Sequence, residues 1–240
     1  MRVPRQAPTL ESFVRKCAIA ALVALMLAGC AGKTTEGSSE PPRLVPDSAL
    51  DGLLLSADEV DAIMGTSGMA PRNQVVATMG DNRNLLPNLN CLGVWQVTQS
   101  PIYDPFHWKT LRQQLLRVPD TEQWDYLAVE SVVSYRTSDG AQAFFDDSAD
   151  RWSKCTNHHV NISLNGGALP KWFSGDLTRT DSTLAMPYTR GEGAQTRSCQ
   201  RVLALSANVI IDAQACKPQQ ATPINSAVEL ADAIESKMPA

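Results

Sequence analysis

The stretch CQRVLALSANVIIDAQAC, residues 199–216, decides the fold class of this 240-residue chain. Two runs rich in apolar and β-branched residues flank the dipeptide Ala207-Asn208, a pattern typical of a β-hairpin. A turn centred on this dipeptide places Cys199 opposite Cys216, at a cross-strand position without mutual hydrogen bonds. Cα atoms at such positions lie about 4.5 Å apart, which a disulfide accepts. We therefore expect a hairpin over residues 196–216 with a Cys199–Cys216 disulfide, although alanine disfavours the positive φ of a tight type I′ turn.

The segments before and after this hairpin combine helical and strand patterns. Ser56 and Glu59 form a capping box ahead of an apolar run, and Gly65 ends the helix that they start. Further helices are expected over residues 105–117, 138–154 and 223–237, and strands over residues 72–79, 92–99, 128–136, 158–164 and 177–186. This order of elements predicts a single α+β domain over residues 50–238, built on a mostly antiparallel sheet with flanking helices.

The first 30 residues match a bacterial lipoprotein signal. Basic residues precede an uncharged apolar run over residues 17–28, which is shorter than the roughly 20 residues of a spanning helix. The string Leu27-Ala28-Gly29-Cys30 is similar to a lipobox, in which the first mature thiol takes lipid. We expect a signal peptide over residues 1–29, palmitate-type lipid on Cys30, and a lipid-anchored location on the extracytoplasmic face of the cell membrane, in the periplasm or cell envelope. The alternative is that Cys30 takes no lipid and is an ordinary small residue after the cleavage site of a signal peptide.

The charge of the mature chain argues against two classes of binding partner. The signal contains four of the 21 basic and one of the 25 acidic residues, which leaves 17 basic and 24 acidic residues and a formal charge of −7. Such a domain is unsuited to nucleic acid or to polybasic contact with anionic headgroups, so the lipid on Cys30 is the expected membrane attachment. Residues 30–49 are rich in Gly, Ser, Thr and Pro and are expected to form a flexible tether.

Four cysteines remain after Cys17 leaves with the signal and Cys30 takes lipid. An even number in an exported domain predicts disulfides, and four cysteines allow three pairings. The hairpin favours Cys199–Cys216, which leaves Cys91–Cys155 by elimination. A metal site is the rival interpretation, but the chain has no C-x-x-C motif. We therefore expect no metal and no cofactor.

No catalytic pattern emerges from the remaining residues. The three histidines lack metal-ligand spacing, and neither a nucleophile elbow nor a phosphate-binding loop is present. The tryptophans and tyrosines are expected to serve mainly in packing, with some available to line a ligand cleft. The sequence thus gives no reason to expect an enzyme.

Three features together resemble the PknH-like extracellular sensor domain. They are the pattern L-L-L-S-x-D-E-V-x-x-x-M-G at residues 53–65, the Cys91 and Cys155 pair, and the block over residues 198–216. That domain occurs in mycobacteria as the external part of a membrane serine/threonine kinase and in free-standing lipoproteins. The resemblance covers residues 50–238 and implies an α+β fold, disulfides from first to second and third to fourth cysteine, and a cleft for an unidentified ligand. Residues 101–126 match it least well.

The resemblance leads to a functional expectation. No kinase domain accompanies the sensor-like domain, so only binding can be inferred from the resemblance. We expect a non-catalytic envelope lipoprotein that binds a small-molecule, lipid or protein ligand, with Trp95, Tyr135 and Trp172 as candidate cleft residues. A scaffold that docks another envelope protein is the alternative, and a hydrolase is the third reading.

Overall fold

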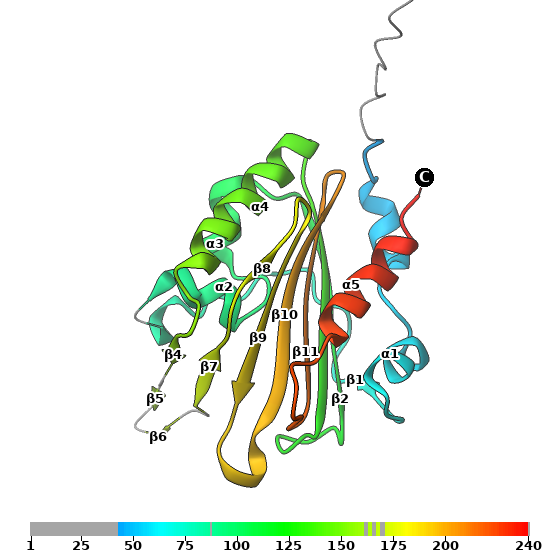
Figure 1. Ribbon diagram of the computed structural model, residues 1–240. Coiled ribbons are helices and arrows are strands. Elements are labelled where there is room, and N and C mark those ends of the chain that lie inside the picture. The colour runs from blue at the N-terminus through cyan, green and yellow to red at the C-terminus, as the bar shows by residue number, and fades with distance from the viewer. Residues whose placement is uncertain (1–42, 87, 161–162, 165–166, 169–170, 240) are drawn as a thin grey trace, which may run out of the picture. The chain divides into compact units, whose positions relative to one another are not determined.

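The computed structural model describes residues 43–86, 88–160, 163–164, 167–168 and 171–239. The expected signal peptide, Cys30 and most of the expected tether lie outside these residues. The described part is a mostly antiparallel sheet with helices on both faces (Figure 1), which confirms the α+β prediction.

One sheet organises the domain. Within the described residues it has nine strands in the order β1-β2-β3-β11-β10-β9-β7-β4, with β8 also paired to β9, and every strand pairing is antiparallel. The strands are β1 (Ala70–Pro71), β2 (Thr110–Val118), β3 (Tyr126–Ser134), β4 (His159–Val160), β7 (Trp172–Ser174), β8 (Thr178–Arg179), β9 (Thr183–Arg190), β10 (Arg197–Ser206) and β11 (Val209–Pro218). A separate pair joins β5 (Ser163–Leu164) to β6 (Gly167–Ala168).

The central hairpin has the predicted register. Cys199 lies opposite Cys216, and the two form a disulfide with a Cα–Cα distance of 4.0 Å. Ala207 takes the positive φ that it disfavours, at 50°. Its neighbour Asn208 stabilises this turn, because its side chain accepts from Val45 N at 2.7 Å and donates to Tyr135 O at 2.9 Å. The cost at Ala207 is thus offset by bonds that fix the turn to two other segments.

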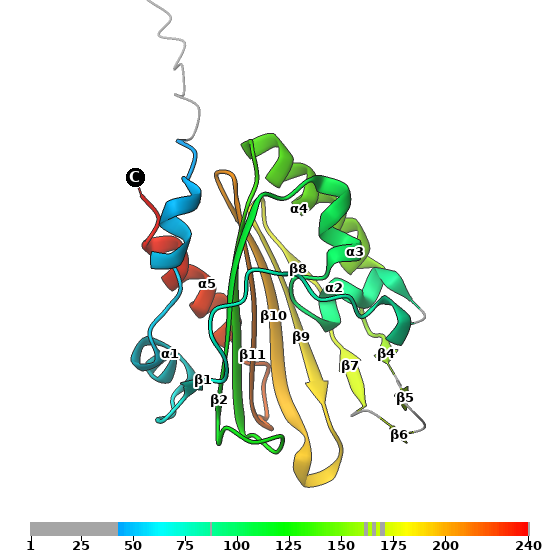
Figure 2. The ribbon, with the colours of Figure 1, turned by 180° about the vertical axis from the view of Figure 1, so that it is seen from behind.

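Two helical layers enclose the sheet, one on each face (Figures 1 and 2). One layer contains α2 (Leu92–Trp95), α3 (Ser100–Tyr103) and α4 (Ser138–Ser153), and the other contains α1 (Ala57–Met64) and α5 (Ser226–Ser236). Short 3-10 turns are η1 (Asp47–Gly52), η2 (Arg83–Leu85), η3 (Leu89–Cys91), η4 (Asp104–Phe106) and η5 (Gly193–Gln195). Each layer covers its own apolar cluster, so we call the two sides of the sheet the α4 face and the α5 face.

The helix boundaries follow local sequence signals. The capping box of Ser56 and Glu59 is present, and Gly65 ends α1 with a φ of 65°. Helix α4 begins at Ser138 as expected, and the side chain of Thr137 accepts the capping bond from Gly140 N. The expected helix over residues 223–237 is α5, which starts only at Ser226.

The helix expected over residues 105–117 is wrong, because most of that range forms the strand β2. Leu111, Leu115 and Leu116 have the spacing of a helical face, which explains the error. Nine consecutive pairs with β3 fix the extended form, and both faces of β2 are covered by apolar clusters. Strand pairing over such a length outweighs the local preference of the chain.

Two expected strands are also wrong. Residues 92–99 begin with the short helix α2, and Thr98 then takes a left-handed φ of 45°. Residues 72–79 make a single bridge, from Val76 to Gln113, because few of their side chains are buried. The segment at 177–186 divides between β8 and β9, and that at 158–164 contributes β4 and β5, while residues 161–162 lie outside the described part.

The second disulfide joins elements of the α4 layer. Cys91 at the end of η3 bonds to Cys155 just after α4, with a Cα–Cα distance of 5.2 Å. Both residues are fully buried in the cluster on the α4 face. Both predicted pairings, Cys91–Cys155 and Cys199–Cys216, are therefore confirmed.

Candidate functional site

A groove runs along β9 on the α5 face. The buried cluster beneath α1 and α5 includes residues of β2, β3, β10 and β11, and among the described residues it includes none of β9. The segment 219–225, which connects β11 to α5, passes beside this uncovered strand and forms the second wall. Two hollows result, with volumes of about 260 Å³ and about 510 Å³. They share Gly175, Pro187 and Pro223, so we treat them as one groove.

Strand alternation determines which side chains line the groove. Successive residues of a strand point to opposite faces. Met186 and Tyr188 of β9 belong to the buried cluster on the α4 face, so Pro187 and Thr189 face the groove. The register then places Gln200 opposite Pro187 and Ser198 opposite Thr189. Gln200 and Ser198 therefore form the floor beside β9.

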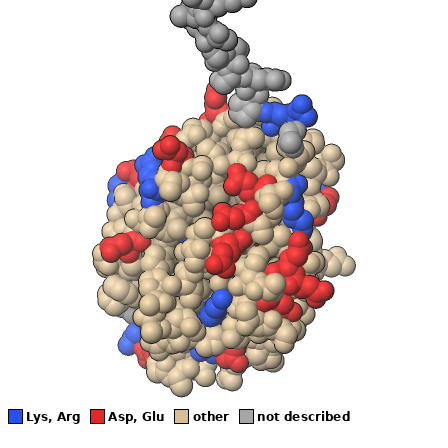
Figure 3. All heavy atoms as spheres, turned by 45° about the vertical axis from the view of Figure 1, so that its right-hand side comes forward, with Lys and Arg blue, Asp and Glu red and all other residues tan. Residues whose placement is uncertain are grey.

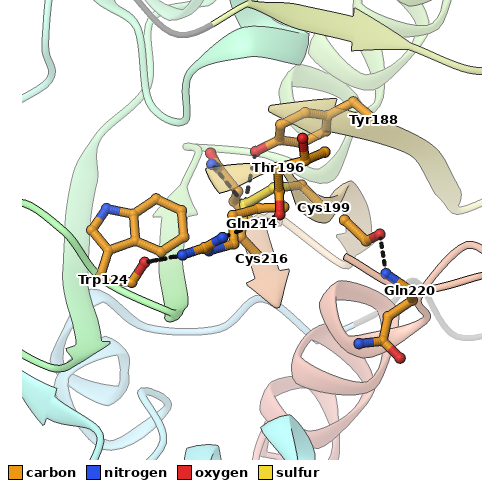
Figure 4. Close-up of a disulfide and its surroundings, with 9 residues drawn as sticks. Trp124, Tyr188, Thr196, Cys199, Gln214, Cys216 and Gln220 are labelled. Carbon is orange, nitrogen blue, oxygen red and sulfur yellow. Dashed lines mark hydrogen bonds between the residues drawn. A yellow bond between two sulfur atoms is a disulfide. The ribbon is translucent and has the colours of Figure 1, made fainter. Parts of the chain in front are cut away.

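The wall over residues 219–225 is held by hydrogen bonds to this floor. Gln220 N donates to Ser198 Oγ at 2.8 Å, and Gln220 is labelled in Figure 4 beside the hairpin disulfide. At the other end of the segment, Gln200 Oε1 accepts from Ala227 N at 3.1 Å and Val228 N at 3.3 Å. These two amides belong to the first turn of α5, where backbone donors need external partners. A sheet side chain therefore caps α5, whose N-cap residue Asn225 makes no side-chain capping bond.

The side-chain amide of Gln200 uses its oxygen in hydrogen bonds but not its nitrogen. Its orientation is fixed because two backbone donors require the oxygen on the α5 side. Its Nε2 group has no acceptor within the part of the chain that the structure describes. Gln200 is only 7% exposed and lines the larger hollow. The groove therefore contains an amide donor on a mostly buried side chain that has no acceptor among the described residues.

The hairpin disulfide stabilises the sheet beside the groove. Cys199 and Tyr188 both contribute to the smaller hollow. Tyr188 Oη lies 3.4 Å from Cys216 Sγ, and Gln214 Nε2 donates to the same sulfur at 3.9 Å (Figure 4). Burial raises the pKa of Tyr188, so its hydroxyl keeps its proton and remains able to donate. The disulfide and these contacts fix β9, β10 and β11 relative to one another.

A buried ion pair connects the sheet to the α4 layer. Arg201 and Asp212 are fully or almost fully buried, with Arg201 Nη2 2.5 Å from Asp212 Oδ1. Arg201 also donates to Gly93 O at 2.8 Å, and its Cζ lies 5.6 Å from the Trp152 ring centre. Asp212 Oδ2 accepts from Tyr103 Oη at 2.7 Å and from the backbone amide of Thr98 at 2.9 Å. This network has a structural role and lies on the face opposite the groove.

A buried carboxyl group lies beneath the start of α1. Glu130 Oε1 accepts from Leu55 N at 2.7 Å and from Gln114 Nε2, whereas Oε2 is buried with no partner among the described residues. Removal from water raises the pKa of Glu130 to about 7, against the lowering effect of the Gln114 bond. Glu130 therefore titrates close to neutral pH.

The predicted cleft residues do not line the groove. Tyr135 and Trp172 are 1% and 2% exposed and belong to the cluster on the α4 face, and the half-buried Trp95 packs against that cluster. None of the three lines either hollow. Their assignment to a ligand cleft stays a prediction. Sequence reasoning missed Gln200, whose only local signal is an amide within an apolar strand.

Acidic side chains gather on the surface of α1 and α5 (Figure 3). Helix α1 contributes Asp58, Glu59 and Asp61, and α5 contributes Glu229, Asp232 and Glu235. Within the described residues no group of three or more His, Cys, Asp or Glu is placed to hold a metal ion. In the same part of the chain, no helix has both the length and the apolar character needed to cross a membrane.

Comparison with known proteins assigns the domain. The model of the PknH-like extracellular domain matches residues 45–237. The chain belongs to the PknH-like extracellular domain family. The crystal structure of the extracellular domain of PknH from Mycobacterium tuberculosis aligns with a TM-score of 0.72 and 28% identity, over 81% of this chain and 97% of that one. Family and fold thus agree with the resemblance seen in residues 53–65 and 198–216.

Curated relatives of this PknH-like domain are much longer proteins. The serine/threonine-protein kinases PknH of Mycobacterium bovis and of Mycobacterium tuberculosis H37Rv are each 29% identical to it over 177 residues. The match covers 74% of this chain but only 29% and 28% of the two kinases. The chain therefore corresponds to the sensor-type part of these relatives. Membership of an extracellular domain family indicates an extracytoplasmic location.

Proposed function

We propose that the protein is a cell-envelope lipoprotein, anchored through lipid on Cys30, whose PknH-like domain binds a ligand in the groove along β9. The groove supports this proposal, because its two hollows have volumes in or near the range of small-molecule sites. The unused donor of Gln200 on its floor favours a ligand with an acceptor group. The domain binds without catalysis, and another envelope protein reports the bound state.

Ligand binding can be tested on protein purified from its host membranes. Ala221 lines the smaller hollow and is exposed, so Ala221→Trp fills the groove without disturbing the core. Native mass spectrometry is expected to show a retained ligand on the wild type and on the control Ala194→Trp, which changes an exposed alanine outside the groove. The ligand is expected to be absent from Ala221→Trp. A ligand that Ala221→Trp and Ala194→Trp retain equally contradicts the proposal. The absence of any ligand from the wild type and from both variants also contradicts it.

The lipid anchor requires its own test. Cys30→Ser removes the thiol that would take the diacylglyceryl group. The variant is expected to leave the membrane fraction and to lose labelling by a palmitate analogue, while Cys17→Ser, in the predicted signal, retains both. Membrane association and labelling that persist in Cys30→Ser would show that the attachment is not this lipid.

A further inference from the structure

We propose that the groove along β9 takes a neutral amphiphile, with a hydroxylated head at the start of α5 and a single alkyl chain against Phe173 and Pro223. The proposal rests on the function proposed for the groove and specifies the chemistry of its ligand. Three observations support it: the charge of the lining, the free donor of Gln200, and the difference between the two hollows.

The lining contains almost no charge. The smaller hollow is formed by 11 residues, none of which is charged: Phe173, Gly175, Pro187, Tyr188, Thr189, Ser198, Cys199, Gln220, Ala221, Thr222 and Pro223. The larger hollow adds a single charged side chain, Asp176. No Lys or Arg lines either hollow, so an anionic head would meet a carboxylate and no compensating cation. Asp176 is exposed and already accepts from Asn157 Nδ2 at 2.8 Å, which weakens its attraction for a cationic head.

The two hollows differ in the groups that they offer. The smaller one alone presents the aromatic surface of Phe173, next to Pro187 and Pro223, which line both hollows, and it also contains the polar side chains of Thr189, Ser198, Gln220 and Thr222. The larger one adds Asp176, Thr178, Gln200 and Asn225, which supply both donors and acceptors. Hydroxyl groups donate and accept at once, so a polyhydroxyl head satisfies such a mixed set better than a purely accepting or donating head. The shared residues connect the two environments, as an amphiphile requires.

Gln200 gives the head its fixed point of recognition. Both amides of α5 that bond to Oε1 prevent the side chain from turning round. The Nε2 group can therefore only donate, and a hydroxyl oxygen of the head is its expected acceptor. A ligand oxygen that accepts from this donor gains affinity, because it forms a hydrogen bond that no described protein group supplies.

The test uses the full mature chain with Cys30→Ser, which cannot be lipidated, and n-octyl-β-glucoside below its micelle concentration as the probe. Proton–nitrogen NMR titration is expected to shift the Gln200 side-chain amide signals and to saturate. Glucose alone, octanol, octyl sulfate and octyltrimethylammonium are expected to bind at least about tenfold more weakly, since each lacks the head, the chain or the neutrality.

Variants separate recognition from folding. Gln200→Glu keeps an oxygen for the α5 amides but loses the Nε2 donor, so the fold and its melting temperature are expected to hold while affinity for octyl glucoside falls about tenfold. Phe173→Ala is expected to weaken the binding of octyl glucoside, because it removes apolar contact with the alkyl chain. Gln74→Glu, the same change at an exposed glutamine outside the groove, is the matched control and is expected to bind normally.

The outcomes distinguish this inference from the function on which it rests. Equal or tighter binding of a charged octyl probe overturns the neutral amphiphile, as does unchanged affinity in Gln200→Glu. Failure of every probe, alongside a native ligand that Ala221→Trp removes, also overturns the inference but leaves a ligand-binding groove. Failure of every probe without such a native ligand overturns both.

Discussion

Arg201 and Asp212 illustrate how a single buried pair supports two layers. The guanidinium contacts the sheet through Ala213 O and the α4 layer through Gly93 O, at 2.5 and 2.8 Å. Removing one partner of a buried pair leaves an uncompensated charge. Asp212→Asn is therefore expected to lower the free energy of unfolding by about 3–5 kcal/mol in urea titrations. Asp232→Asn, which changes an exposed residue, is the control. An equal loss of unfolding free energy in Asp212→Asn and Asp232→Asn would show that the loss does not come from the ion pair.

Glu130 makes stability depend on pH. Its pKa is raised by burial from 4.5 to about 7, so between these values the folded protein binds a proton that the unfolded chain releases. The stability that this proton confers is complete below about pH 4.5 and is lost as the pH rises through about 7. Glu130→Gln is expected to flatten this part of the profile and to raise the melting temperature at pH 8.

Thermal unfolding of Glu130→Gln and wild type between pH 5 and pH 8 measures this effect. The profile of Glu235→Gln, which changes an exposed carboxyl of α5, should parallel that of the wild type. If the melting temperatures of wild type and Glu130→Gln differ by the same amount at every pH in this range, the Glu130 carboxyl group does not titrate there.

At the scale of elements, the Cys91–Cys155 disulfide connects η3 and α2 to the end of α4. It closes a loop with a sequence separation of 64 residues. The chain-entropy estimate for such a loop is about 4 kcal/mol. The double variant Cys91→Ala/Cys155→Ala is expected to lose roughly that much stability in urea titrations, and hydrogen exchange is expected to speed up more in α2 and α4 than in β10 and β11. Equal acceleration in all four elements would show that the α4 layer does not unfold separately from the sheet.

The elements also show what sequence patterns can and cannot predict. The hairpin of β10 and β11 was predictable because its two strands are adjacent in the chain and two cysteines report their register. Strand β2 was not, although its partner β3 follows it directly in the chain, because no cysteine pair reports their register and the spacing of Leu111 and Leu115 is that of a helical face. Gln200 escaped notice because the amides that orient it are 27 and 28 residues further along. Aromatic content alone pointed to Trp95, Tyr135 and Trp172, and strand alternation placed Trp172 on the opposite face.

At the scale of the whole molecule, the described chain enters the domain at the turn of the central hairpin. Val45 N donates to Asn208 Oδ1 at 2.7 Å, and Asn208 Nδ2 donates to Val45 O at 3.2 Å. Asn208→Ala is expected to loosen the chain at Val45 and to speed hydrogen exchange at its amide, with a loss of about 1–3 kcal/mol in the free energy of unfolding. Asn73→Ala, the same change at an exposed position, is the control. Unchanged exchange at Val45 would show that other contacts hold this segment.

The position of Asn208 has a mechanical consequence for an anchored protein. The turn follows Ser206, the last residue of β10. Ser198 of the groove lies eight residues before Ser206, roughly 26 Å at strand spacing. If Cys30 is held in a bilayer and a ligand is held in the envelope, tension between them runs along β10 and β11. Inter-strand hydrogen bonds lie across that direction, so they are loaded in shear and must break together rather than one after another. The central strands of the sheet would thus carry the load.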